Sequence, residues 1–134
     1  MGLKYILDTH ALIWYLEGNL RLGAAAKAAM DDPISDLILP IIALAEAVDI
    51  VDKGRTGITD VSVLLDRVLN DPRIEIHPLT FDVLKHSLAA TAVPEMHDRL
   101  IVATALFLQS LGHQTALLTK DNQILASALV PVVW

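Results

Sequence analysis

The sequence contains no cysteine, which excludes disulfide bonds, zinc sites built on thiolates and a cysteine nucleophile. Aromatic residues are scarce as well, at 4% of the chain, although 54% of the 134 residues are hydrophobic. The core must therefore be built mainly from Leu, Ile, Val and Ala side chains, a composition that suits helices packed on a sheet. A chain of this length is expected to fold as one domain over residues 1–134.

Long hydrophobic segments and an excess of positive charge are also missing. The longest apolar runs, such as residues 101–108, fall well short of the roughly 18 residues that suggest a membrane span. Asp8 arrives too early to leave room for the apolar region of a signal peptide. We therefore expect a soluble, cytoplasmic protein with no membrane partner. The formal net charge of −6 argues against an extended basic surface, so a polyanionic substrate needs another source of positive charge.

Strand and helix patterns alternate along almost the whole chain. Short apolar or alternating runs predict strands at residues 4–7, 37–39, 74–76, 115–119 and 130–134. Helical patterns between them are expected at residues 9–16, 23–30, 41–51, 61–69, 81–91, 98–111 and 123–129. This alternation predicts an α/β, Rossmann-like fold with a parallel sheet of four to five strands and helices on both faces.

Four acidic residues occupy comparable places in this pattern. Asp8 and Asp121 directly follow predicted buried strands, and Glu46 and Asp98 lie in helices of the same sheet. In an open α/β sheet, ligands bind beyond the carboxyl ends of the strands. We therefore expect the four side chains to meet at one rim of the sheet.

Each of these acids also has a purely structural explanation. Asp8 and Asp121 are suited to capping the helices that follow them. Asp98 stands at a helix start, where the macrodipole favours a carboxylate by roughly 0.3–1 kcal/mol. Glu46 is followed by Asp49 and Lys53 at spacings that are typical of a solvated helix stripe.

Four carboxylates at one rim would repel one another. Two unit charges about 4 Å apart cost about 4 kcal/mol at an effective dielectric constant near 20. Protons or a cation must therefore neutralise such a cluster, and ligands that offer only oxygen select Mg²⁺ or Mn²⁺ over zinc. A hard ion of this kind binds a phosphate and activates a water for attack on it. It would also supply the positive charge that the composition lacks.

Four segments of the chain resemble the acidic motifs of PIN-domain ribonucleases, most closely the VapC-like toxins of type II toxin–antitoxin pairs. They are ILDTHALIW at residues 6–14, Ala45-Glu46, DRLIVATA at residues 98–105 and LTKDNQI at residues 118–124. The resemblance covers nearly the whole chain and implies a single PIN-like domain. It further implies Asp8, Glu46, Asp98 and Asp121 as catalytic residues around Mg²⁺ or Mn²⁺, with RNA as substrate. A homodimer and a cognate antitoxin are the implied protein partners.

The chain departs from the family pattern at two places. Family members often carry Ser or Thr before the second acid, where this chain has Pro40 and Ala43. The loop before Asp98 often contains another aspartate, and here Glu95 can serve in its place. These differences bear on the fine geometry and the rate.

Four further residues are candidates for binding the substrate or supporting the acids. Thr9 and Thr119 are expected to be helix caps or donors that orient the carboxylates. Arg99 and Lys120 flank two of the acids and can hold a phosphate, with a surface ion pair as the alternative.

Two other functions compete with the ribonuclease hypothesis. A non-catalytic PIN-like module that binds a partner protein or RNA would explain the missing hydroxyls before Glu46. A phosphate-accepting aspartate enzyme is disfavoured, because Asp8 lacks the Asp-x-Asp arrangement of such phosphatases and no acidic pair precedes it.

Overall fold

A computed structural model describes residues 2–134 and contains one parallel sheet. Within these residues the sheet has five strands in the order β3-β2-β1-β4-β5, and every neighbouring pair is parallel. The strands are β1 (Lys4–Leu7), β2 (Asp36–Pro40), β3 (Ile74–His77), β4 (Thr115–Leu118) and β5 (Val132–Val133). The α/β class and the parallel sheet expected from the alternating pattern are confirmed, with β3 at one edge.

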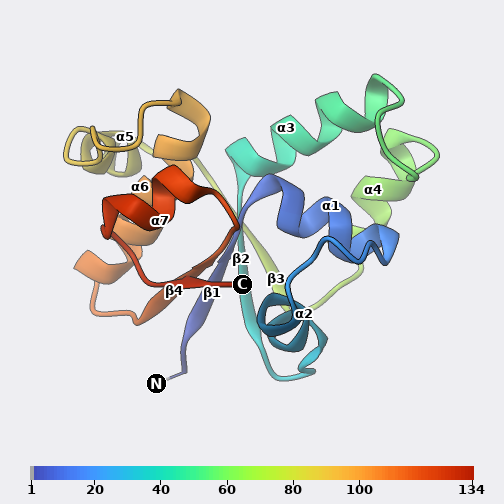
Figure 1. The fold of residues 1–134 in the computed structure, drawn as a ribbon, viewed down its shortest axis with the longest axis horizontal. Helices are drawn as coiled ribbons and strands as arrows, with labels where there is room; N and C mark the ends of the chain where they lie inside the picture. The colour runs from blue at the N-terminus through green and yellow to red at the C-terminus, as the bar shows by residue number, and fades with distance from the viewer. Residues whose placement is uncertain (1) are drawn as a thin grey trace.

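Helices cover both faces of this sheet (Figure 1). One face carries α1 (Thr9–Glu17), α2 (Ala24–Asp31), α3 (Ile41–Asp52) and α4 (Val61–Leu69). The other carries α5 (Phe81–Ser87), α6 (Met96–Ser110) and α7 (Asn122–Ser127). The chain winds outward from β1 to β3 and then crosses back to β4, so the topological switch point lies between β1 and β4.

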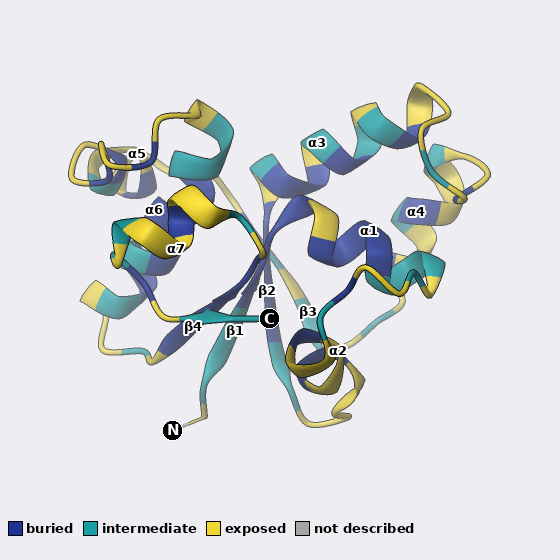
Figure 2. Ribbon diagram, in the orientation of Figure 1, coloured by how far each residue is buried: buried dark blue, intermediate teal, exposed yellow. Residues whose placement is uncertain are grey.

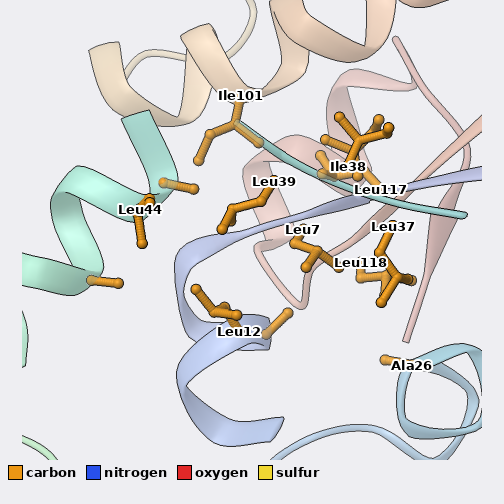
Figure 3. Packing of buried hydrophobic residues seen from close by; sticks show 14 of the residues in the cluster. Leu7, Leu12, Ala26, Leu37, Ile38, Leu39, Leu44, Ile101, Leu117 and Leu118 are labelled. Carbon is orange, nitrogen blue, oxygen red and sulfur yellow. The ribbon is translucent and has the colours of Figure 1, made fainter. Parts of the chain in front are cut away.

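The core lies where the central strands meet the helices on either side. Figure 2 shows buried residues concentrated in these strands, with exposed residues on the outer faces of the helices. Leu7 and Leu118 are paired in register and are fully buried, and Leu12 of α1 packs nearby (Figure 3). Aliphatic side chains dominate the core, as the scarcity of aromatic residues predicts.

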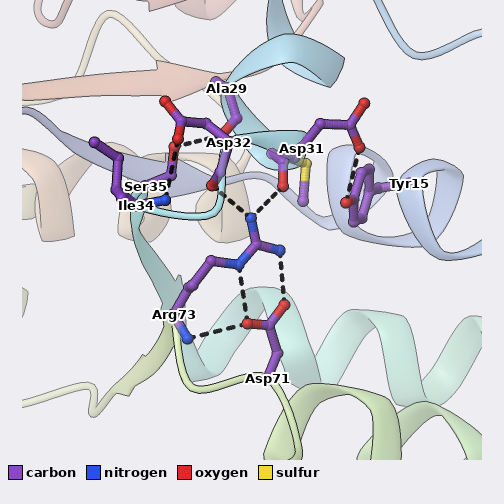
Figure 4. Close-up of polar contacts among 9 residues, drawn as sticks. Tyr15, Ala29, Asp31, Asp32, Ile34, Ser35, Asp71 and Arg73 are labelled. Atoms are coloured by element: carbon purple, nitrogen blue, oxygen red, sulfur yellow. Dashed lines mark hydrogen bonds and ion pairs between the residues drawn. The ribbon is translucent and has the colours of Figure 1, made fainter.

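An arginine ties the elements together at the opposite end of the sheet from the strands' carboxyl ends. Arg73, just before β3, pairs with Asp71 at 2.9 Å and also donates hydrogen bonds to the backbone oxygens of Met30 and Asp32 (Figure 4). These contacts join the start of β3 to the segment after α2. They stabilise the end of the sheet that lies opposite the acidic residues.

Several element boundaries differ from the sequence expectations. The α5 helix ends at Ser87 rather than near residue 91, because the following residues form turns whose hydrogen bonds join residues three apart, before Pro94. Helix α6 begins at Met96 rather than at Asp98, because the Glu95 side chain caps it. Helix α7 ends at Ser127 because Ala128 adopts a positive φ of 54°.

Two smaller corrections concern the last strand and the first helix cap. The last strand is limited to Val132–Val133. The first helix is capped by Asp8 rather than by Thr9. In residues 2–134, no helix combines the length and the apolar character that crossing a membrane requires.

Candidate active site

A cleft of about 500 Å³ opens at the switch point, beyond the carboxyl ends of β1 and β4. The four predicted acids all line it, although they come from four separate segments of the chain. Its lining residues are Asp8, Thr9, His10, Ala11, Trp14, Glu46, Ile50, Glu95, Asp98, Lys120, Asp121 and Trp134. The topology therefore brings together four acids of which the first and last, Asp8 and Asp121, are 113 positions apart.

Asp8 lies deepest and is held by two hydrogen bonds. Its Oδ1 accepts from the backbone N–H of Thr9 at 2.6 Å, and its Oδ2 accepts from the Thr119 hydroxyl at 2.6 Å. Burial raises the pKa of this carboxyl above its usual value, and the two hydrogen bonds only partly offset that rise. Asp8 therefore caps α1, as its structural explanation proposed, and also contributes to the wall of the cleft.

Glu46 turns away from the solvated stripe of α3. Its Oε1 accepts a hydrogen bond from the Thr9 hydroxyl at 3.0 Å, whereas Asp49 pairs with Lys53 at 2.8 Å in solvent. Burial raises the pKa of Glu46 above its ordinary value. A hydroxyl from α1 thus orients this carboxylate, although Pro40 and Ala43 cannot supply one.

Asp98 has a strongly raised pKa. Burial, followed by the charges of Asp8, Asp121, Glu95 and Glu46, raises the pKa of Asp98 to about 7. Its side chain is half-buried in the first turn of α6. The negative charges of the other carboxylates therefore make Asp98 harder to ionise, as expected where several acids lie close together.

Glu95 and Asp121 combine helix capping with a place in the cleft. Glu95 accepts from the backbone N–H of Asp98 at 2.9 Å, and its other oxygen lies 2.7 Å from Nδ1 of His97. These hydrogen bonds outweigh burial and lower the pKa of Glu95. Asp121 accepts from the backbone N–H groups of Gln123 and Ile124 through Oδ1 alone.

The donor set fits a hard divalent cation by its chemistry, because it consists of carboxylate oxygens in a mutually repelling group. In residues 2–134, however, no group of three or more Asp, Glu and His side chains is arranged so that it can hold a metal ion as it stands. Three of the acids, Asp8, Glu95 and Asp121, also use oxygens to cap helices. Ion binding therefore requires small side-chain adjustments within the cleft.

A family model for the PIN domain matches residues 5–128. The chain belongs to the PIN-domain family. The match includes all four acids and every strand up to β4, which agrees with the fold and with the cleft at the switch point.

The PIN domain also has the fold of several solved structures. It aligns with a chain of FitAcB from Neisseria gonorrhoeae at a TM-score of 0.69 and 22% identity, covering 96% of this chain and 95% of that one. A chain of VapBC2 from Rickettsia felis, solved with a DNA fragment from its promoter, aligns at a TM-score of 0.66 and 16% identity, with 97% coverage of each. DNA-bound VapBC from Salmonella typhimurium gives a TM-score of 0.66 at 16% identity, with coverage of 98% and 97%. A comparison with curated protein sequences returned no match.

The four supporting residues of the PIN domain lie in different environments. Thr9 and Thr119 are 3% and 1% exposed and donate to Glu46 and Asp8, so they orient carboxylates. Lys120 lines the cleft, with its Nζ 4.9 Å from the centre of the Trp14 ring. Arg99 instead donates to the backbone oxygens of Val93 at 2.8 Å and Pro94 at 3.4 Å and does not line the cleft.

Sequence reasoning did not assign His10, Trp14 and Trp134 to this cleft. The Trp14 ring packs in the core and also contacts His10 and Trp134 at centroid distances of 5.2 and 5.9 Å. His10 and Trp14 are four residues apart in α1, so both side chains lie on the same side of the helix, which faces the cleft. Trp134 had no signal in the sequence, because its place depends on how β5 returns beside β4.

Proposed function

We propose that the protein is a metal-dependent endoribonuclease that hydrolyses RNA phosphodiester bonds. The observation that carries the proposal is the acidic cleft at the switch point, where burial and then the charges of neighbouring carboxylates raise the pKa of Asp98 to about 7. Such a cluster favours a divalent cation, because neutralisation relieves the repulsion between its charges. Membership of the PIN-domain family supports RNA as the substrate class.

The residues of the cleft would divide the chemistry between them. Asp8 and Asp98 are the proposed direct ligands of Mg²⁺ or Mn²⁺, and Asp121 is the proposed outer ligand. When bound, the ion supplies positive charge for the phosphate and makes a water more acidic. Glu46 serves as a further ligand or as the base that orients the attacking water, and Thr9 holds its carboxylate through Oε1.

Replacement of Asp8 by Asn tests the proposal most simply. Asn keeps the shape and can still accept from the Thr9 backbone N–H, so we expect the fold to survive. Cleavage of single-stranded RNA in Mg²⁺ should fall below detection in Asp8→Asn. Asp66→Asn is the matched control, because Asp66 is an exposed acid on α4 far from the cleft lining. Unchanged turnover in Asp8→Asn would refute the assignment.

We also propose that the protein is the toxin of a toxin–antitoxin pair, with a cognate antitoxin as partner and a homodimer as the assembly. Its similarity to chains of FitAcB and VapBC complexes supports this proposal. Co-expression with the product of an adjacent small reading frame should yield a stable complex in which RNA cleavage is suppressed. Sedimentation of the purified chain should give twice its mass of 14.6 kDa.

A non-catalytic module that binds a partner protein or RNA is the competing function. One observation favours it: in residues 2–134, no three side chains are arranged to hold an ion as they stand. The hydrogen bond from the Thr9 hydroxyl to Glu46 favours the enzyme instead, because it replaces the hydroxyl that Pro40 and Ala43 lack. An inert module should bind Mn²⁺ no better than Asp8→Asn does, whereas the enzyme should lose Mn²⁺ binding in that variant.

A further inference from the structure

Three exposed cations gather around Trp14, beside the acidic cleft. The Nζ atom of Lys120 lies 4.9 Å from the centre of the Trp14 ring, and Cζ of Arg21 lies 5.9 Å from it. Arg55 joins Arg21 and Trp14 in the lining of a second hollow of about 210 Å³. Within residues 2–134, none of these three cations forms an ion pair with an acidic side chain.

The second hollow adjoins the acidic cleft along α1. Both are lined by His10, Trp14 and Ile50, so a chain that leaves the acids past Trp14 enters the second hollow directly. In Figure 1, α1 runs from the middle of the molecule, where the strands end, toward the loop between α3 and α4 that carries Arg55. The two hollows therefore form one path along this helix.

One acid, Glu17, also lines the second hollow. Its Oε2 accepts from the backbone N–H of Gly57 at 2.6 Å, and its Oε1 accepts from the Asn19 side chain at 3.3 Å. Neutral donors thus use both of its oxygens, and neither arginine is paired with it. The positive charge of Arg21 and Arg55 stays available to a ligand.

Among the residues that the structure describes, Lys120 also has no ion pair with an acidic side chain, although it directly precedes Asp121 in the sequence. Its ammonium lies over the Trp14 ring rather than on a carboxylate of the cleft, an arrangement in which the ring stabilises the cation without neutralising it. In a protein of net charge −6, cations without acidic partners along one path are a local exception to the overall charge. They favour a polyanion that passes the acids and continues beyond them.

We propose that Lys120, Arg21 and Arg55 form a backbone subsite that binds phosphates of single-stranded RNA next to the scissile one. The proposal rests on the ribonuclease function and identifies where the flanking strand runs. A positively charged groove with aromatic side chains is the usual way to bind a single strand without reading its sequence. Lys120 and Arg21 would hold phosphates on either side of Trp14, and Arg55 would hold one beyond them.

The test measures binding separately from cleavage. Every variant is made in the Asp8→Asn background, and binding of a labelled single-stranded RNA is followed by fluorescence anisotropy in EDTA at several salt concentrations. Each lost phosphate contact should reduce the slope of log affinity against log salt by about 0.7. We expect this reduction in Arg21→Gln and in Lys120→Gln, and about twice as much in the double variant.

Lys85→Gln is the matched control. Lys85 also lies over an aromatic ring, that of Phe81 at 5.7 Å, but it belongs to α5 on the other face of the sheet. The subsite predicts an unchanged salt slope in this control. Equal losses in Lys85→Gln and Arg21→Gln, or equally tight binding of a poly-glutamate peptide, would show a general charge effect and overturn the proposal.

Cleavage by the otherwise unaltered protein separates this proposal from the one on which it rests. If that protein cleaves RNA while Arg21→Gln and Lys120→Gln bind like the control, the subsite is wrong and the nuclease stands. If binding shows the expected slopes but no cleavage occurs in Mg²⁺, the nuclease is wrong and the subsite stands as an RNA-binding surface. Both tryptophans line the cleft, so quenching of intrinsic emission by RNA gives a second measure of binding.

Discussion

Thr119 shows how a single hydroxyl can control the acidic site. It donates to Asp8 at 2.6 Å, accepts from the backbone N–H of Asp121 at 3.1 Å and is 1% exposed. Thr119→Val keeps the shape but removes both hydrogen bonds, which further raises the pKa of Asp8 because the Thr119 hydroxyl lowers it. We expect Mn²⁺ affinity, measured by calorimetry, to fall by about 10–100-fold.

Thr119→Ser is the control for this prediction. Serine restores the hydroxyl and loses only a methyl group, so its Mn²⁺ affinity should stay close to that of the original protein. If Val and Ser bind the ion equally well, the hydroxyl has no part in orienting Asp8.

The raised pKa of Asp98 predicts how the free energy of unfolding depends on pH in the absence of metal. Its pKa is raised from 3.8 to about 7, first by burial and then by its acidic neighbours. Between these two pH values the folded state holds a proton that the unfolded state has lost, so the free energy of unfolding falls as pH rises through this window. Urea denaturation in EDTA should therefore show lower stability at pH 8 than at pH 5.

Asp98→Asn supplies the comparison, because it removes this titrating group. Its stability should decline less between pH 5 and pH 8 than that of the original protein. Parallel declines in the two proteins would show that Asp98 is not the group responsible.

At the scale of residues, the sequence identified the acids but not their environments. Asp8, Asp98 and Asp121 stand out because each follows a strand or opens a helix in the repeating pattern, and Glu46 stands out as an acid within an apolar helix. That Thr9 reaches Glu46 across 37 positions depends on how α1 and α3 pack, which no local pattern records. The cleft position of Trp134 likewise follows from strand order.

At the scale of elements, Arg73 is the residue that ties β3 to the segment after α2. Its guanidinium pairs with Asp71 and donates to two backbone oxygens, and its side chain is 18% exposed. Arg73→Met should lower the free energy of unfolding by about 1.5–3 kcal/mol, because it leaves these acceptors without their charged donor. Urea denaturation measures this loss directly.

Arg73→Lys keeps the charge without the planar fork, so its loss should be smaller than that of Arg73→Met. Neither variant should change Mn²⁺ affinity in the folded protein, because Arg73 lies at the opposite end of the sheet from the acids. An altered affinity would show that this end of the scaffold also sets the geometry of the cleft.

Element types were easier to predict than element ends. The helix starts predicted at residues 61 and 81 are confirmed, and the side chains of Asp60 and Thr80 cap these helices. The predicted ends of α5 and α7 are wrong, because the turns after Ser87 and the positive φ of Ala128 depend on packing rather than on Gly or Pro. The cap of α6 was missed because Glu95 was considered only as an acid of the site.

At the scale of the whole molecule, the strand order determines which charges meet. The return of the chain from β3 to β4 places Asp121 beside Asp8, and the middle of α3 and the first turn of α6 bring two more acids to the same opening. Alternating patterns predict a parallel sheet, but they do not predict which strands are neighbours. Strand order had to come from the structure, whereas the meeting of the acids at one rim was expected from their places in the pattern and is confirmed.

The proposed ribonuclease depends on these acids binding a divalent ion together. This binding can be measured by calorimetric titration of Mn²⁺ into the protein, Asp8→Asn, Asp98→Asn and the control Asp66→Asn. We expect saturable binding in the original protein and in Asp66→Asn, and loss of that binding in each of the two cleft variants. Mn²⁺ binding that survives in both cleft variants would refute a shared ion site, and so would the absence of binding in the original protein.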